Sequence, residues 1–288
     1  MVWYNITFSQ ELEPRSFTNI PRGMNFVVVG YSYSFGNVLL DAQLPADEIR
    51  SKLHTTFGAY VRSIKIFGLS GKVDLMIPWA SGDYSTVVED IDSGRSVSGL
   101  GDSRFRLTVN FTGAPSLTKE EFRDYKPTVI SGMSLRIICP TGEYDPNYVV
   151  NLGSNRWVFW PTWGISKFLN KWILEGHVNV AFITPNREFL VDNTLTQKPL
   201  GGFKIHVIRS FKGNWWISLS SGYLTGGKTY IDGEVKDSRI SNLRIGLNAA
   251  VTIRQNNVLR LTSFTGIRFD RGADFDAIAL TYQFRWIK

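Results

Sequence analysis

Hydrophobic and polar residues alternate one by one along much of this chain, most clearly near its end. From Asn242 to Ile253 the odd-numbered positions are Leu, Ile, Leu, Ala, Val and Ile, and the even-numbered positions are Asn, Arg, Gly, Asn, Ala and Thr. A period of two predicts a β-strand with two unlike faces. Residues 259–268 and 274–288 repeat the pattern, and Arg254–Asn257 predicts a turn before them.

The same alternation predicts nine more strands, at residues 23–33, 54–66, 73–79, 105–111, 129–137, 157–165, 172–182, 203–207 and 215–223. Short connections near 69, 119, 169, 212 and 255 alternate along the chain with longer polar ones near 42, 91, 147, 191, 232 and 271. The long connections are expected to be loops over 36–47 and 81–101, with a short helix over 46–52. Thr118 and Glu121 have the spacing of a capping box.

Aromatic residues gather at the strand ends, next to both the short turns and the long loops. In a soluble sandwich the arginines of such strands would face water and the aromatic rings would lie in the core. A membrane barrel instead presents an apolar band to lipid, aromatic belts at both interfaces and polar groups to its lumen. We therefore predict an all-β, antiparallel transmembrane β-barrel of about 12 strands, with short periplasmic turns and long extracellular loops. Residues 22–288 would form this single domain, after an irregular periplasmic segment at 1–21.

Composition fits this prediction. The 288 residues contain no apolar run of the ~18 that a membrane helix needs. The net charge is +7, but no Lys/Arg run or recognition motif indicates nucleic acid as a partner. The single Cys139 excludes an internal disulfide. No signal peptide is visible, so an exported form is expected to have lost it.

The polar faces of the strands are expected to line the lumen. They supply mostly basic side chains, and the candidate pore-lining residues are Arg62, Asp74, Arg104, Arg106, Arg136, Arg156, Glu175, His177, Lys204, His206, Arg244, Arg260, Arg268 and Arg285. This set indicates a basic passage for anionic or polar solutes. The alternative is that arginine–carboxylate pairs brace the wall and close the lumen. On the same basis, an arginine is expected to be tolerated at the inward Asn248 but not at the outward Leu247.

We find no pattern of catalytic or metal-binding residues. The chain lacks Gly-x-Ser-x-Gly and His-Glu-x-x-His segments and a clear acidic Ca²⁺ loop. Its three histidines, His54, His177 and His206, are interpreted as polar groups. No cofactor and no metal are expected.

Several segments resemble one family of bacterial outer-membrane proteins. They are Glu11–Pro21 and Gly23–Phe26, Tyr144–Pro146 and Asn151–Trp157, and Gly226–Thr229, Asp232–Gly233 and Gly272–Asp276. Together they are similar to the "meta-pathway of phenol degradation" family. The resemblance implies an exported Gram-negative outer-membrane barrel, usually labelled a transporter, with no catalytic residues to carry over. It also implies that Arg15, Asn19, Asn155 and Arg156 brace the N-terminal segment or a loop.

The sequence thus predicts a protein of the bacterial outer membrane that contacts outer-membrane lipids or lipopolysaccharide. Its expected function is passive uptake of small solutes, with aromatic or anionic compounds as candidates, and it is not expected to be an enzyme. Two alternatives remain open: a barrel enzyme acting on lipid or lipopolysaccharide, and a closed structural barrel. A histidine paired with a serine or carboxylate on the outer face would favour the enzyme.

Overall fold

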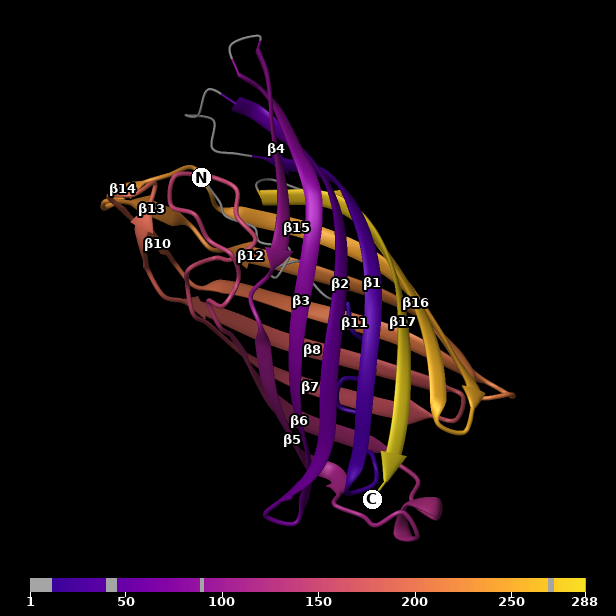
Figure 1. The fold of residues 1–288 in the computed structure, drawn as a ribbon. Helices are drawn as coiled ribbons and strands as arrows, with labels where there is room; N and C mark the ends of the chain where they lie inside the picture. The colour runs from indigo at the N-terminus through magenta and orange to yellow at the C-terminus, as the bar shows by residue number, and fades with distance from the viewer. Residues whose placement is uncertain (1–11, 40–45, 89–90, 269–271, 288) are drawn as a thin grey trace.

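The computed structural model describes residues 12–39, 46–88, 91–268 and 272–287, whose strands close into a tilted barrel (Figure 1). The wall consists of twelve antiparallel strands: β1 (Met24–Leu39), β2 (Ala46–Ile66), β3 (Leu69–Val88), β5 (Arg104–Pro115), β6 (Val129–Ile138), β7 (Val158–Leu169), β8 (Trp172–Ile183), β11 (Leu200–Phe211), β12 (Trp215–Gly226), β15 (Ile240–Arg254), β16 (Asn257–Arg268) and β17 (Gly272–Ile287). Because β1 pairs with both β17 and β2, and β2 pairs with β3, the twelve wall strands close into a cylinder. The predicted fold class and strand number are confirmed.

Two successive strands, β4 (Ile91–Leu100) and β5, lie along the same side of β3. The lower half of β3 pairs with β5, and its upper half pairs with β4. Residues 101–103 interrupt the line between β4 and β5. No helix among the described residues is long and apolar enough to cross a membrane.

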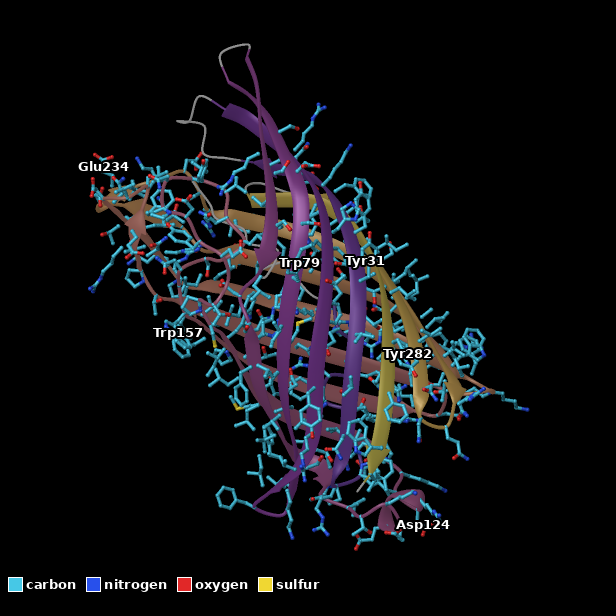
Figure 2. All side chains as sticks on the ribbon, viewed as in Figure 1. Tyr31, Trp79, Asp124, Trp157, Glu234 and Tyr282 are labelled. Carbon is cyan, nitrogen blue, oxygen red and sulfur yellow. The ribbon has the colours of Figure 1, made fainter. Side chains whose placement is uncertain are left out.

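The two faces of the strands follow the predicted alternation in most of the wall. On β15, Leu247 is 63% exposed on the outside, while its neighbour Asn248 is buried in the interior. Aromatic side chains such as Trp79, Trp157 and Tyr282 are exposed on the outer surface (Figure 2). Such an exposed apolar band is the surface that lipid covers in a membrane barrel.

Strand β2 is the exception, and the predicted inward position of Arg62 is wrong. Arg62 is exposed and lies on the outer face with Tyr60, near the end of the strand. Phe57 instead points inward, where it packs on Gly30 so closely that a Cβ there would lie 2.3 Å from its ring. Because both faces of β2 mix apolar and polar residues, alternation alone does not tell which side faces lipid. A long arginine at a barrel end can reach water past the lipid.

The longer connections also differ from the prediction. Much of 36–47 and 81–101 is strand, since β1 and β2 extend to Leu39 and Ala46, and β3 and β4 extend to Val88 and Ile91. No helix forms in the described part of 46–52, which is strand. The extensions are rich in polar residues and glycine, which gave them the sequence character of loops, while pairing between the hairpin strands satisfies the backbone.

Two other loops carry a small sheet at the same end of the barrel (Figure 1). Its strands are β9 (Asn186–Phe189), β10 (Asn193–Gln197), β13 (Thr229–Ile231) and β14 (Glu234–Val235), in the order β14-β13-β10-β9. At the other end lie the short turns and a 3-10 helix, η2 (Glu121–Arg123). The capping box is confirmed, because the Thr118 N–H donates to Glu121 and the Glu121 N–H donates to the Thr118 hydroxyl.

Candidate functional site

Residues 12–21, called here the N-terminal segment, lie inside the barrel. Well-separated parts of the wall hold its backbone. Asn248 of β15 donates to the Leu12 carbonyl, and Asn110 of β5 donates to the Phe17 carbonyl at 3.0 Å. On β8, Glu175 accepts the Arg15 N–H at 2.7 Å. The segment therefore crosses the lumen, whereas the sequence suggested a periplasmic position for this stretch.

Phe17 is the apolar anchor of the N-terminal segment. Its side chain is 1% exposed and packs with Ala114 and Ile130. Gly132 and Gly164 make room for the ring, since a Cβ at Gly164 would lie 2.1 Å from it. These two glycines thus serve close approach of a side chain rather than an unusual backbone angle.

A charged cluster joins the segment to the wall. Arg106 donates to Glu13 at 2.7 Å and to Asp74 at 2.8 Å, and Arg136 lies 3.9 Å from Glu13. Arg106 and Arg136, both predicted to line the pore, are opposite each other on β5 and β6, and Arg104 lies on the same inner face. The sequence reading missed Glu13, because the irregular segment gives no periodic signal to place it in the lumen.

Other predicted lumen residues make structural contacts. Arg156 is 1% exposed and donates to Gln197 of the loop strand β10 at 3.0 Å, while Arg285 donates to a turn carbonyl at Gln255. The guanidinium groups of Arg244 and Arg260 lie over aromatic rings on the inner face. Lys204 also faces inward. The side chain of Arg268 lies outside the described residues.

The residues singled out by the family resemblance do brace the chain. Asn19 donates to the Pro115 carbonyl at 3.1 Å and accepts the Ile20 N–H. Asn155 donates to Asn186 and Glu188 in the loops. These bonds hold the N-terminal segment at one end of the barrel and the loop sheet at the other.

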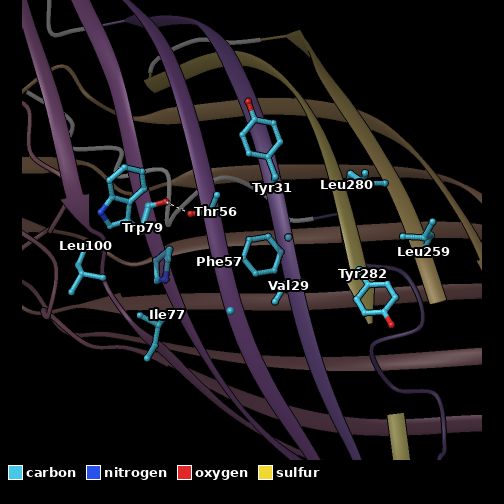
Figure 3. Close-up of a pocket in the computed structure, with 13 residues that line it drawn as sticks. Val29, Tyr31, Thr56, Phe57, Ile77, Trp79, Leu100, Leu259, Leu280 and Tyr282 are labelled. Atoms are coloured by element: carbon cyan, nitrogen blue, oxygen red, sulfur yellow. Dashed lines mark hydrogen bonds between the residues drawn. The ribbon is translucent and has the colours of Figure 1, made fainter. Parts of the chain in front are cut away.

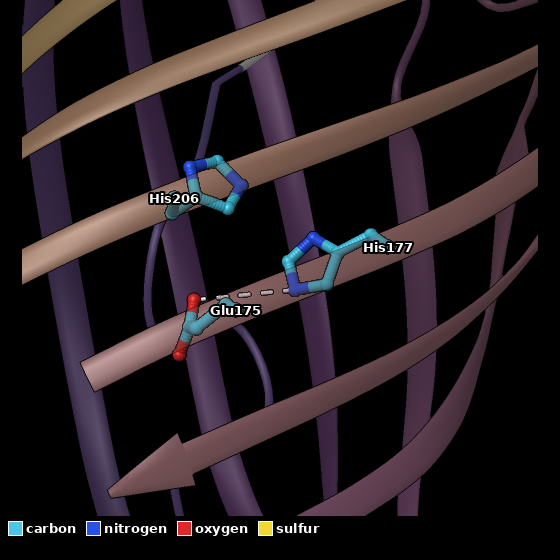
Figure 4. A group of neighbouring side chains, drawn as sticks. All are labelled: Glu175, His177 and His206. Atoms are coloured by element: carbon cyan, nitrogen blue, oxygen red, sulfur yellow. Dashed lines mark ion pairs between the residues drawn. The ribbon is translucent and has the colours of Figure 1, made fainter. Parts of the chain in front are cut away.

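Glu175, His177 and His206 come together on the inner wall (Figure 4). His206 is bonded through Nδ1 to the Ser220 hydroxyl at 2.8 Å, and all of these residues are buried. A serine–histidine pair therefore exists, but it faces the lumen instead of the outer surface. His54 lies outside, bonded to the Tyr31 hydroxyl at 2.6 Å.

An apolar hollow of about 510 Å³ lies on the outer wall (Figure 3). It lies where β2 presents the small residues Thr56 and Gly58 between the larger Tyr31, Ile77 and Trp79 of its neighbours. Nothing lies within 4 Å of a Cβ built at Gly58. The hollow thus follows from side-chain size on the lipid-facing surface, and it is separate from the charged lumen cluster.

Comparison with protein-family models matches residues 28–284 to the family described as "Putative MetA-pathway of phenol degradation". None of the curated proteins compared with the chain matches it. Among solved structures, the COG4313 outer membrane channel from Pseudomonas putida F1 is similar, with a TM-score of 0.79 at 18% identity over 96% of this chain and 100% of that chain.

Two autotransporter barrels share the fold more distantly. The transport unit of AIDA-I from Escherichia coli gives a TM-score of 0.54 at 10% identity, over 99% of this chain and 94% of that one. The beta domain of the Bordetella autotransporter BrkA gives 0.52 at 12% identity, over 92% and 100%. At these identities the structures establish the fold, which is that of outer-membrane barrels.

Proposed function

The chain belongs to the family described as "Putative MetA-pathway of phenol degradation", and on this premise we propose that it is a channel for passive uptake of small solutes across the bacterial outer membrane. The observation that carries the proposal is the polar, charged lumen. Thr108, Asn179 and Ser218 face the interior, along with the arginines described above. A barrel with a purely structural role would be more stable with an apolar core, since buried ion pairs often stabilise a fold less than packed hydrophobic residues.

The charge of the lumen indicates which solutes would pass. Among the described inward side chains, basic groups outnumber Glu13, Asp74 and Glu175, although the wall pairs offset part of the charge. A positive passage lowers the energy of an anion inside it and raises that of a cation. Guanidinium groups lie over rings, as Arg260 does over Trp216. We therefore propose small anions, aromatic acids among them, as the solutes.

The N-terminal segment would be the constriction of this passage. Its ion pair with Arg106 is partly exposed, with the Glu13 side chain 34% accessible, so solvent screens it. Phe17, by contrast, is fully enclosed. Movement of the segment would accordingly begin at Glu13, while the Phe17 end stays anchored.

Ion selectivity in a planar bilayer tests the proposal. In a salt gradient the open channel should prefer anions. Replacing Arg104 and Arg106 together with Ser should shift the reversal potential toward cation preference, because the change removes two positive charges and leaves Glu13 and Asp74 without the Arg106 partner. The shift should shrink in molar salt, where the Debye length is ~3 Å.

Arg62→Ser is the matched control. It removes an arginine of the same barrel, but from the outer face, so the reversal potential should stay at the wild-type value. A wild-type channel that prefers cations, or a double variant with an unchanged reversal potential, would contradict the proposed basic passage.

A lipid-directed enzyme is less well supported. Its histidine–serine pair would have to meet substrate at the outer surface, yet His206 and Ser220 are 0% and 1% exposed inside the barrel. The proposal that the protein is not an enzyme rests on the burial of His206 and Ser220 inside the barrel, together with the family.

A further inference from the structure

We infer that Glu175, His177 and His206 form a binding site for a divalent transition-metal ion that favours nitrogen ligands, such as Cu²⁺ or Zn²⁺. One ligand atom from each residue lies within 4.8 Å of the other two. Figure 4 shows the two imidazole rings and the carboxylate gathered on the inner wall. This inference goes beyond solute uptake. Its three residues differ from Arg104 and Arg106, which carry the test of ion selectivity.

The strand register creates the cluster. Glu175 and His177 are two residues apart on β8, so both point inward. On β11, His206 is opposite Glu175. The result is a triangle of donors, with His177 Nε2 4.0 Å from the Glu175 carboxylate and the two histidine rings 5.0 Å apart between centroids.

The histidine nitrogens supply the second observation. Nε2 of His177 and Nε2 of His206 are both buried, and neither has a hydrogen-bond partner among the described residues. Burying such a group without a partner is unfavourable, by an amount comparable to a lost hydrogen bond. A metal ion between the rings would satisfy both nitrogens at once.

Second contacts already orient the ligands. His206 Nδ1 lies 2.8 Å from the Ser220 hydroxyl; when it donates its proton there, Nε2 keeps the lone pair a metal needs. The Glu175 carboxylate accepts hydrogen bonds from Ser166 and from the Arg15 N–H. Metal-binding histidines and carboxylates typically have such outer partners, which fix the tautomer and the direction of the ligand.

The donor set and its surroundings select the kind of ion. Two imidazoles and one carboxylate suit Zn²⁺, Cu²⁺ or Ni²⁺, whereas Ca²⁺ and Mg²⁺ prefer oxygen ligands. Lys204 and Arg106 act electrostatically against a cation at His177, while Glu13 favours one, so the two imidazoles would select ions with strong nitrogen affinity. Metal–ligand bonds of about 2 Å place tetrahedral ligand atoms roughly 3.3 Å apart, so the donor atoms, which now lie up to 4.8 Å apart, must approach one another by up to about 1.5 Å.

Binding of Cu²⁺ to the folded full-length chain, without a histidine tag, tests the site. The chain has only three histidines, so few imidazoles compete. We expect one Cu²⁺ per chain, with an electron paramagnetic resonance spectrum showing coupling to two imidazole nitrogens. His177→Gln and His206→Gln should each lower the affinity at least tenfold and reduce the coupling to one nitrogen. Ser220→Ala, which removes only the outer contact, should lower the affinity about tenfold.

His54→Gln is the matched control, because it removes the outward histidine and should leave affinity and spectrum unchanged. Slower migration after boiling than before identifies variants that have folded. If a histidine variant fails this check, Glu175→Gln and Ser220→Ala carry the test. The inference is overturned if the wild type binds no Cu²⁺ at one equivalent, if the spectrum lacks imidazole coupling, or if only His54→Gln weakens binding.

Discussion

An arginine placed on the lipid face should cost most at the membrane midplane, and strand β15 allows this to be tested at two depths. Leu247 and Ile253 both point outward, with exposures of 63% and 55%. Leu247 is opposite Leu219, which lies midway between the aromatic residues Trp215 and Tyr223 of β12. Leu247 is therefore near the midplane of the apolar band.

Strand geometry sets the depth of the second position. Ile253 is six residues further along, or about 20 Å at ~3.4 Å per residue. A strand tilt of about 40° reduces this to roughly 15 Å along the membrane normal, and the apolar band extends only ~12 Å from its centre. Leu247→Arg should consequently cost about 2–4 kcal/mol and Ile253→Arg about 0–1 kcal/mol.

Reversible denaturant unfolding in lipid vesicles measures both free energies. The two variants share strand, face and introduced side chain, so their difference isolates depth. Equal costs, or a larger cost at Ile253, would refute the placement of β15 in the membrane. Asn248→Arg, which the sequence alone predicts to be tolerated, should also destabilise the fold, because Asn248 is buried and bonded to both Leu12 and Thr262.

Three further predictions concern the closed barrel, the N-terminal segment and the stability of the capping box in acid. Since the twelve wall strands close into a cylinder, unboiled protein should migrate faster than boiled protein in detergent gels, and identical migration would count against the fold. Gly164→Val should displace Phe17, whose ring would lie 2.1 Å from the new Cβ, and so expose the N-terminal segment to trypsin. Gly176→Val is the control: the nearest atom to its new Cβ is 3.9 Å away, so the segment should stay as protected as in the wild type. Equal cleavage of both variants would disprove the role of Gly164. The Thr118 backbone N–H, and then its hydroxyl, lower the pKa of Glu121, so the capping box stabilises above the unfolded pKa of about 4.3 and loses this effect as pH falls through the lowered folded pKa. The protection factor of the residue 118 amide, which is the exchange rate of an unfolded chain divided by that of this amide at the same pH, should fall over that acid range. Thr118→Gly, which keeps the N–H but removes the hydroxyl, should move this fall to higher pH; an unchanged profile would contradict the prediction.

The sequence by itself determined the strands, the turns at one end and the side each residue faces over most of the wall. Alternation is a local property, and lipid outside against polar groups inside makes the two faces chemically distinct, as at Leu247 and Asn248. That contrast fails on β2, where Phe57 packs inward and Arg62 faces out. It also fails at 81–85, where a paired strand consists mostly of polar residues and glycine.

Only the tertiary structure decided what fills the lumen. Glu13 meets Arg106 from 93 residues away, and Phe17 fits between two glycines of different strands. Likewise, His206 joins Glu175 and His177 because β8 and β11 pair in one particular register. A period of two specifies which way a side chain points, but it carries no information on register or on the path of an aperiodic segment. Those are set by closure of the barrel and by packing and charge pairing across its interior.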